Sequence, residues 1–257
     1  MKVKNILVSQ PQPADLGKSP YGELIKRFNV KIDFHKFIKV EGISAKEFRM
    51  AKGSFNGHTA IILTSRHAVD HFFRMAKELR FEIPDSLKYF CISESTAYYL
   101  QKYVQYRKRK IFYGKQNFVD LMEVIKKHEE EFFLVPSSDI HKQTMFTLLD
   151  KEKIKHSKAV IYRTVASNLS DLDINKYDLM IFYSPAGIKS LQNNFPDYDQ
   201  SGKLIAAFGK TTAKAVKDAG LKLNIPAPTQ SAPSMSMALD EYLTKLTKEN
   251  RRNGRSR

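Results

Sequence analysis

The chain of 257 residues is 42% hydrophobic and 27% charged, which leaves room for two folded domains and excludes a disordered chain. Its formal net charge of +16 favours anionic partners. No apolar run reaches the roughly 20 residues of a membrane helix, and the apolar stretch at residues 4–9 is too short for a secretory signal, so we expect a cytoplasmic protein. The only cysteine, Cys91, excludes an intrachain disulfide framework and a cysteine-based zinc site, and its apolar neighbours favour an inert core thiol.

Strands and helices are expected to alternate along the first two thirds of the chain. Runs of apolar and β-branched residues predict strands at 4–9, 30–40 (one long or broken strand), 58–65, 89–92, 110–113, 132–135 and 159–164. Apolar residues at helical spacing predict helices at 21–28, 45–51, 68–79, 95–104, 118–128 and 140–149.

The same alternation begins again in the last third. Strands are expected at 179–183, 204–208 and 221–225, and helices at 186–192, 212–219 and 234–246. Pro226 and Pro228 predict a loop before the last helix. Residues 248–257 carry five basic residues and one acidic residue and predict a disordered tail. Apolar strands that alternate with helices indicate parallel α/β sheets.

Two segments of the chain resemble each other. AIILTSRHAVDHF aligns with LMIFYSPAGIKSL and places Ser65 opposite Ser184, while two Thr-Ala pairs place Thr96 opposite Thr212. The two matches have nearly the same offset, which indicates two related α/β lobes.

Small hydroxyl residues follow the predicted strands repeatedly. These residues are Ser65, Ser93, Thr96, Ser137, Ser138, Ser184, Thr211 and Thr212. Each one alone is explained by helix capping, for which Ser and Thr are favoured. Together they would lie at the carboxyl ends of parallel strands, where ligands bind. A cleft lined by hydroxyl and backbone N–H groups would fit a small molecule that bears several carboxylates.

The segment Gly209-Lys210-Thr211-Thr212 joins a predicted strand to a predicted helix and suits an anion. A phosphate-binding P-loop is excluded, because that motif needs a glycine at position 204, where this chain has leucine. The side chain of Lys210 either reaches a ligand or faces solvent.

Other motifs give weaker signals. His67 and His71 lie four residues apart, but Ala68 replaces the glutamate of the zinc-protease helix, so a solvated helix face is favoured. No Gly-x-Gly-x-x-Gly occurs, which weakens a dinucleotide site. Six basic residues at 102–115 are interleaved with aromatic residues, a pattern that could bind nucleic acid but favours a solvated surface. Tyr162 is either a proton donor in the cleft or a packing residue of its strand.

These pieces together resemble one enzyme family, the uroporphyrinogen-III synthases. The resemblance rests on TSRHAV, Ser-Thr-Ala at 95–97, VIYRT, FYSPAGI and FGKTTAKAVKDAG, in the family's order and over nearly the whole chain. It implies two α/β lobes joined by two antiparallel linker strands, with a cleft between the lobes. The first lobe would hold residues 1–37 and 166–257, and the second residues 38–165 with the linker strands near 37–43 and 159–164.

The resemblance implies that hydroxymethylbilane, a linear tetrapyrrole with eight carboxylates, is cyclised with inversion of the last pyrrole ring and loss of water, without a metal or organic cofactor. It implies that Tyr162 assists departure of the hydroxyl and that Ser65, Thr96, Ser184, Thr211 and Thr212 bind carboxylates. The sequence departs from the family pattern in two places. Arg66-His67 replaces the usual Pro-Arg, and the segment after Ser137 and Ser138 lacks the usual glycine and arginine.

We therefore expect a monomeric enzyme of haem biosynthesis. The first alternative is a non-catalytic two-lobed module that binds a tetrapyrrole or another polyanion. The second is nucleic-acid binding through residues 102–115 and the basic tail.

Overall fold

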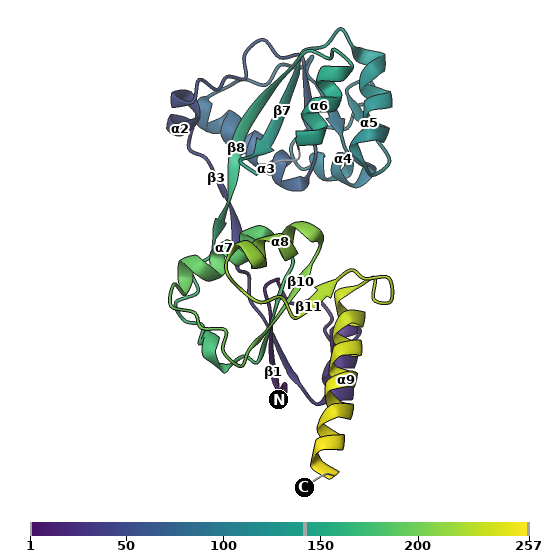
Figure 1. Cartoon of the computed structure of the whole chain (residues 1–257). Helices are drawn as coiled ribbons and strands as arrows, with labels where there is room; N and C mark the ends of the chain where they lie inside the picture. The colour runs from purple at the N-terminus through teal and green to yellow at the C-terminus, as the bar shows by residue number, and fades with distance from the viewer. Residues whose placement is uncertain (1, 141–142, 256–257) are drawn as a thin grey trace. The chain divides into compact units, whose positions relative to one another are not determined.

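The computed structural model describes residues 2–140 and 143–255 (Figure 1). It divides the chain into two compact units. Unit 1 consists of Met1–Lys39 and Val165–Arg257, and unit 2 consists of Val40–Thr164. Unit 1 is therefore built from two separate stretches of the chain.

Unit 1 contains a five-stranded sheet with the order β11-β10-β9-β1-β2, in which every neighbouring pair is parallel. Its strands are β1 (Asn5–Val8), β2 (Lys31–Phe34), β9 (Leu179–Phe182), β10 (Leu204–Phe208) and β11 (Ile225–Ala227). Its helices are α1 (Pro20–Phe28), η2 (Ile174–Lys176), α7 (Pro185–Asn194), α8 (Lys210–Asp218) and α9 (Met235–Arg255).

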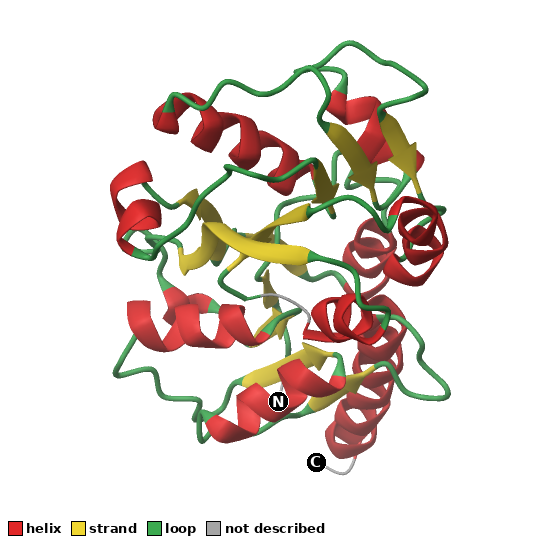
Figure 2. Ribbon diagram, turned by 90° about the horizontal axis from the view of Figure 1, so that it is seen from above, coloured by secondary structure: helices red, strands yellow, loops and turns green. Residues whose placement is uncertain are grey.

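Helices cover both faces of this sheet, because the strands are apolar on both sides. Ile6 and Val8 of β1 belong to a core with residues of α1 and α9, while Leu7 between them belongs to a core with residues of α7 and α8. The same alternation of faces occurs along β9 and β10. Figure 2 shows helices flanking the strands.

Unit 2 contains a six-stranded sheet with the order β3-β8-β7-β4-β5-β6. Its strands are β3 (Ile38–Gly42), β4 (Ala60–Leu63), β5 (Lys88–Cys91), β6 (Ile111–Tyr113), β7 (Phe133–Ser138) and β8 (His156–Ala166). Its helices are α2 (Ala45–Met50), α3 (Arg66–Leu79), α4 (Glu94–Leu100), α5 (Phe118–Ile125), η1 (Lys126–His128) and α6 (Gln143–Lys151). Residues of α2, α3 and α4 pack on one face, and residues of α5 and α6 on the other.

The pairs from β8 to β6 are parallel. The strands β3 and β8 are antiparallel, because residues further along β3 pair with residues earlier in β8. The Ser167 N–H donates to the Phe37 carbonyl, and the Ile43 N–H donates to the Ile161 carbonyl, at 2.9 and 3.0 Å. The boundary between the units falls within these two strands.

The two sheets have the same plan. The order β8-β7-β4-β5-β6 matches β2-β1-β9-β10-β11, and the helices that follow matching strands pack on matching faces. The expected fold class, two related parallel α/β sheets, is confirmed. The order of the matching strands along the chain differs, because unit 1 takes two of its strands from the start of the chain.

One open expectation is decided, and two others are wrong. Residues 30–40, expected as one long or broken strand, are broken into two strands, β2 and β3, which belong to different sheets. The last strand of unit 1 begins at Ile225, not residue 221, and contains Pro226, which an edge strand tolerates. The expected disordered tail is helical as far as Arg255, because α9 continues through Lys, Glu and Arg residues of good helix propensity. Residues 141–142 of the expected helix at 140–149 and residues 256–257 lie outside the described residues.

Candidate functional site

Three neighbouring strands of unit 2 bring polar side chains together beside the carboxyl ends of β4 and β7. Ser65 follows β4, Ser138 ends β7, and Tyr162 lies on β8, in the strand order β8-β7-β4. The Ser65 side chain lies close to the Tyr162 hydroxyl. Ser65 is also the N-cap of α3, since its Oγ accepts from the Ala68 N–H at 3.1 Å. Ser65 therefore caps α3 and lies beside Tyr162, and its role in binding a ligand stays a prediction.

A β-bulge places Tyr162 in this group. Ser137 pairs with Val160, but Ser138 pairs with Tyr162, so Ile161 is an extra residue on β8. The Asp139 N–H donates to the Tyr162 carbonyl at 3.1 Å and holds the strand end beyond the bulge. Bulges occur often beside functional sites, where they turn a side chain to a new direction.

The phenol of Tyr162 is 8% exposed and stacks on His71 of α3, with ring centroids 5.1 Å apart and an angle of 17°. Burial raises the pKa of Tyr162, and the nearby Ser65 hydroxyl opposes that rise. The phenol is therefore protonated at neutral pH. It is suited to donate a hydrogen bond to a neighbouring oxygen rather than to act as a base.

Asp139 fixes the end of β7 against β8. Its carboxylate accepts from the Ser138 hydroxyl at 2.7 Å and from the Thr164 N–H at 3.1 Å. Partial burial raises the pKa of Asp139, but these hydrogen bonds and that of Ile140 lower it more, so the pKa lies below its ordinary value.

Asp139→Ala is therefore expected to destabilise unit 2 most at neutral pH. A lowered pKa means that the charged carboxylate stabilises the fold fully above the unfolded value of about 3.9, and that this contribution is lost as the pH falls through the folded value. Urea midpoints of both proteins across this range would measure the difference, with exposed Asp171→Ala as control. A difference that stays constant down to the lowest pH would contradict the assignment.

Of the other site residues predicted in unit 2, some are exposed and others are buried. Arg66 and His67 are exposed in the first turn of α3, and the Arg66 guanidinium lies 5.3 Å from the centre of the Tyr99 ring. Thr96 is 5% exposed, and its Oγ1 lies 3.2 Å from the Oγ of Ser93, which caps α4.

Ser137 is 3% exposed and donates to the carbonyl of Val135 at 2.8 Å. Thr96 and Ser137 are thus engaged within the chain, and the hydroxyl of Ser93 bonds to those of Ser95 and Thr96.

Unit 1 carries a similar group of hydroxyls at the carboxyl ends of β9 and β1. Ser184 caps α7 through the Gly187 N–H at 3.2 Å. A Cβ atom built on Gly187 would lie 3.7 Å from the Oγ atoms of both Ser184 and Ser9, so the two serines are neighbours. Sequence reasoning missed Ser9. Ser9 directly follows the first strand, as the other hydroxyl residues follow their strands, and this position could have identified it.

The segment Gly209-Lys210-Thr211-Thr212 begins α8 without a side-chain cap. Gly209 has φ +88° and ψ 148°, a conformation reserved for glycine, and the space beside its Cα is open. Lys210 and Thr211 are exposed, whereas Thr212 is 1% exposed. Because α3, α4 and α7 are capped by serines, α8 differs from them in leaving its first N–H groups free of a side-chain partner.

Two tyrosines that the sequence did not single out lie beside this group. The hydroxyls of Tyr21 and Tyr183 are hydrogen-bonded to each other, and burial raises the pKa of both phenols. Tyr183 directly precedes Ser184 and packs near Phe208 at the end of β10, with ring centroids 5.8 Å apart. Half-buried aromatic rings therefore adjoin the hydroxyls of unit 1.

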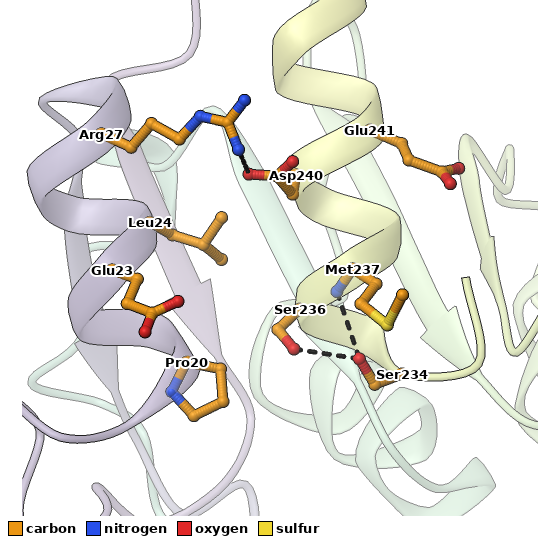
Figure 3. A pocket seen from close by; sticks show the side chains of 9 residues that line it. All are labelled: Pro20, Glu23, Leu24, Arg27, Ser234, Ser236, Met237, Asp240 and Glu241. Atoms are coloured by element: carbon orange, nitrogen blue, oxygen red, sulfur yellow. Dashed lines mark hydrogen bonds and ion pairs between the residues drawn. The ribbon is translucent and has the colours of Figure 1, made fainter. Parts of the chain in front are cut away.

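A separate pocket of about 600 Å³ lies between α1 and α9 (Figure 3). Glu23, Leu24 and Arg27 of α1 and Asp240 and Glu241 of α9 line it; Asp240 faces Arg27, with which it forms an ion pair of 2.5 Å, while the Glu241 side chain points away from α1. Three carboxylates and one guanidinium give this pocket a negative charge. It is therefore a poor site for a polyanionic ligand.

Among the described residues, His128, Glu130 and Glu131 are the only group with metal-ligand spacing. The Lys88 ammonium lies 2.5 Å from Glu131 and 3.6 Å from Glu130, and it supplies the positive charge there. This group is explained by ion pairing. No helix in the described part of the chain is both long and apolar enough to cross a membrane.

Comparison with known proteins agrees with the two-unit fold. The crystal structure of uroporphyrinogen-III synthetase from Helicobacter pylori 26695 is similar, with a TM-score of 0.54 and 17% identity over 94% of this chain and 99% of that chain. A mutant uroporphyrinogen III synthase from the extremely thermophilic bacterium Thermus thermophilus gives a TM-score of 0.45 and 12% identity over 95% and 99% of the two chains. A search of curated protein sequences gives no match.

The sequence itself provides the assignment to a family. The family model described as "Uroporphyrinogen-III synthase HemD" matches residues 36–236, which is well over half of the chain and includes the strand ends of unit 2 and the ends of β9 and β10 in unit 1. The chain therefore belongs to the uroporphyrinogen-III synthase family.

Proposed function

We propose that this chain cyclises hydroxymethylbilane to uroporphyrinogen III and that Tyr162 assists the first step. The observation that supports this role is the position of the Tyr162 phenol, which is protonated, stacks on His71 and lies near Ser65, beside the carboxyl ends of β4 and β7. In that step the bond between carbon and the terminal hydroxyl breaks, the hydroxyl leaves with a proton as water, and the last pyrrole ring supplies the electron pair for a new bond to the cationic chain end. A phenol that donates to the departing oxygen lowers the barrier to this break.

The remaining task is to hold one folded conformation of the substrate. Because hydroxymethylbilane closes without inversion when left alone, the enzyme must favour the spiro route by positioning. Hydroxyl and N–H donors at Ser65, Ser138, Ser184 and the first turn of α8 would bind carboxylates of the substrate. The formal charge of +16 would attract its eight carboxylates from solution.

The test supplies hydroxymethylbilane to the purified protein and separates the type I and type III products. We expect type III to predominate. Type I alone, in the presence of excess protein that binds the substrate, would instead establish the non-catalytic binding module. Type I alone without binding would exclude both functions.

Gly209 at the start of α8 provides a second test of the proposed function. Its backbone conformation affects the stability of the fold, whereas its position beside the first N–H groups of α8 affects substrate binding. Gly209 and Gly202 both have positive φ, +88° and +72°, and both have open space beside the Cα. Alanine at either position is expected to cost about 1–3 kcal/mol of stability. Only Gly209→Ala is expected to raise KM, since it disturbs the uncapped N–H groups. Equal KM values for the two variants would remove the start of α8 from the binding site.

We also propose that nucleic acid is not the partner and that the enzyme is a monomer. In segment 102–115, Lys102 lies over the Tyr99 and Tyr103 rings, and Tyr103 stacks on Phe73 and donates to Asp70 at 2.6 Å. A ring already stacked within the chain has less surface for a base. Light scattering, with and without single-stranded DNA at low salt, would test both statements.

A further inference from the structure

Behind Tyr162 lies a set of contacts that ends in one arginine. The His71 ring stacks on the Tyr162 ring, and the Arg74 Nε donates to the Nδ1 of His71 at 3.2 Å. Since Nδ1 accepts this hydrogen bond, the proton of the neutral imidazole is on Nε2. Burial lowers the pKa of His71, and the nearby Arg74 and His67 lower it further. A neutral ring thus fills the space between Arg74 and Tyr162.

The same arginine also holds the backbone at the bulge. The Nη2 of Arg74 donates to the carbonyls of Ile43 and Ile161, at 2.9 Å each. Ile161 is the extra residue of β8, directly before Tyr162. The Nη1 of Arg74 pairs with Glu78, which fixes the guanidinium from its other side. Arg74 therefore contacts both the ring on which Tyr162 stacks and the peptide that precedes it.

Gly42 at the end of β3 provides the room for the guanidinium. A Cβ atom at this position would lie 2.5 Å from the Cζ of Arg74. Since real atoms do not approach so closely, any larger residue at position 42 would displace the guanidinium. The sequence thus contains two matched features for this contact, an arginine on α3 and a glycine on β3.

We propose that Arg74 is a positioning residue, which acts through the His71 ring and the Ile161 carbonyl to hold the Tyr162 hydroxyl at the substrate. This inference rests on the proposed role of Tyr162 in the reaction. Arg74 itself needs no contact with substrate. Its planar guanidinium makes hydrogen bonds in several fixed directions at once, which a lysine ammonium cannot reproduce.

The inference predicts a specific pattern of activities. Arg74→Met is expected to lower kcat for type III product about tenfold, because misplacement of a reacting group is costly, while KM changes little. Arg74→Lys is expected to lower kcat equally, since lysine keeps the positive charge but cannot donate hydrogen bonds in the same fixed directions as the guanidinium. Lys77→Met removes a positive charge from an exposed position of the same helix and is expected to leave kcat unchanged.

The deciding measurement is a double-mutant cycle with Tyr162→Phe. If Arg74 acts through the Tyr162 hydroxyl, Arg74→Met lowers kcat in the wild-type chain but not in the Tyr162→Phe chain. If Arg74→Met lowers kcat by the same factor in both chains, the positioning role is overturned and the role of Tyr162 is left intact. If Tyr162→Phe alone has no effect on kcat, both the proposed role of Tyr162 and the positioning role of Arg74 are wrong.

Gly42→Ala provides the second variant, in case Arg74→Met does not fold. It keeps the arginine but displaces its guanidinium from the Ile161 carbonyl. The same loss of kcat, again absent in the Tyr162→Phe chain, is expected. A Gly42→Ala protein with wild-type kcat would overturn the inference, provided that hydrogen exchange shows its α3 as protected as in the wild type.

Discussion

Replacing Tyr162 by phenylalanine is expected to lower kcat for type III product by about 100-fold, at the lower end of the range for loss of general acid assistance. The fold is expected to persist, because phenylalanine keeps the ring that packs on His71, and the nearby Ser65 hydroxyl still accepts from the Ala68 N–H. Since other groups would hold the carboxylates in the proposed function, KM is expected to change little. Rapid-quench kinetics with product separation would measure both constants.

The matched control is Tyr89→Phe. Tyr89 is also a strand tyrosine of unit 2, it is 5% exposed, and burial raises its pKa to about 12, but it lies on β5 in the core that faces α3. Loss of its hydroxyl is expected to leave kcat unchanged. A comparable loss of kcat in both variants would indicate a general effect of removing a phenol, and Tyr162 would lose its assigned role.

The largest effect on stability is expected from Phe72→Ala. Phe72 of α3 is completely buried and stacks on Phe55, with centroids 5.1 Å apart. Removing its ring would leave a cavity in the core of unit 2 and cost about 3–5 kcal/mol. Because the chain contains two units with separate cores, only the unfolding of unit 2 is expected to shift to lower urea.

Hydrogen exchange followed by mass spectrometry separates the two units, since each peptide reports on its own region. Peptides from β4 and α3 should lose protection at lower urea in Phe72→Ala, and peptides from β9 and β10 should not. Tyr98→Ala, at a position that is 75% exposed, serves as the control with an effect within about 0.5 kcal/mol. A parallel shift of both units would show that they unfold together and contradict independent cores.

The sequence predicted the elements well where the hydrophobic pattern alone decides them. The continuous apolar run at β4 became a strand buried on both faces, and the helical spacing after it became α3. The predictions failed where tertiary context decides. Pro226 suggested a loop, but its place at the sheet edge permits a strand. The charge of the tail suggested disorder, although the same residues favour a helix that begins on the core of unit 1.

The polar site was less accessible to sequence reasoning. Ser65 and Ser138 were found because hydroxyls follow strands, but the residues alone left Tyr162 open between packing and proton donation, and the family resemblance decided for a role. The proximity of Tyr162 to Ser65 and His71 could not be predicted, because the bulge at Ile161 and the stack on His71 depend on how β7, β8 and α3 pack. The roles of these residues stay predictions until the variants are measured.

The matching plans of the two sheets bear on how such a chain could arise. Taken from β9 through α9 and then from β1 to β2, unit 1 repeats the strand order of unit 2 from β4 to β8. Lys2 and Val3 line a pocket together with Leu243 and Leu246 of α9, so the two stretches of unit 1 adjoin where such a chain would be joined. A gene cut after β8 and closed through this junction would encode two complete domains in tandem. The present order is that of a circularly permuted duplication.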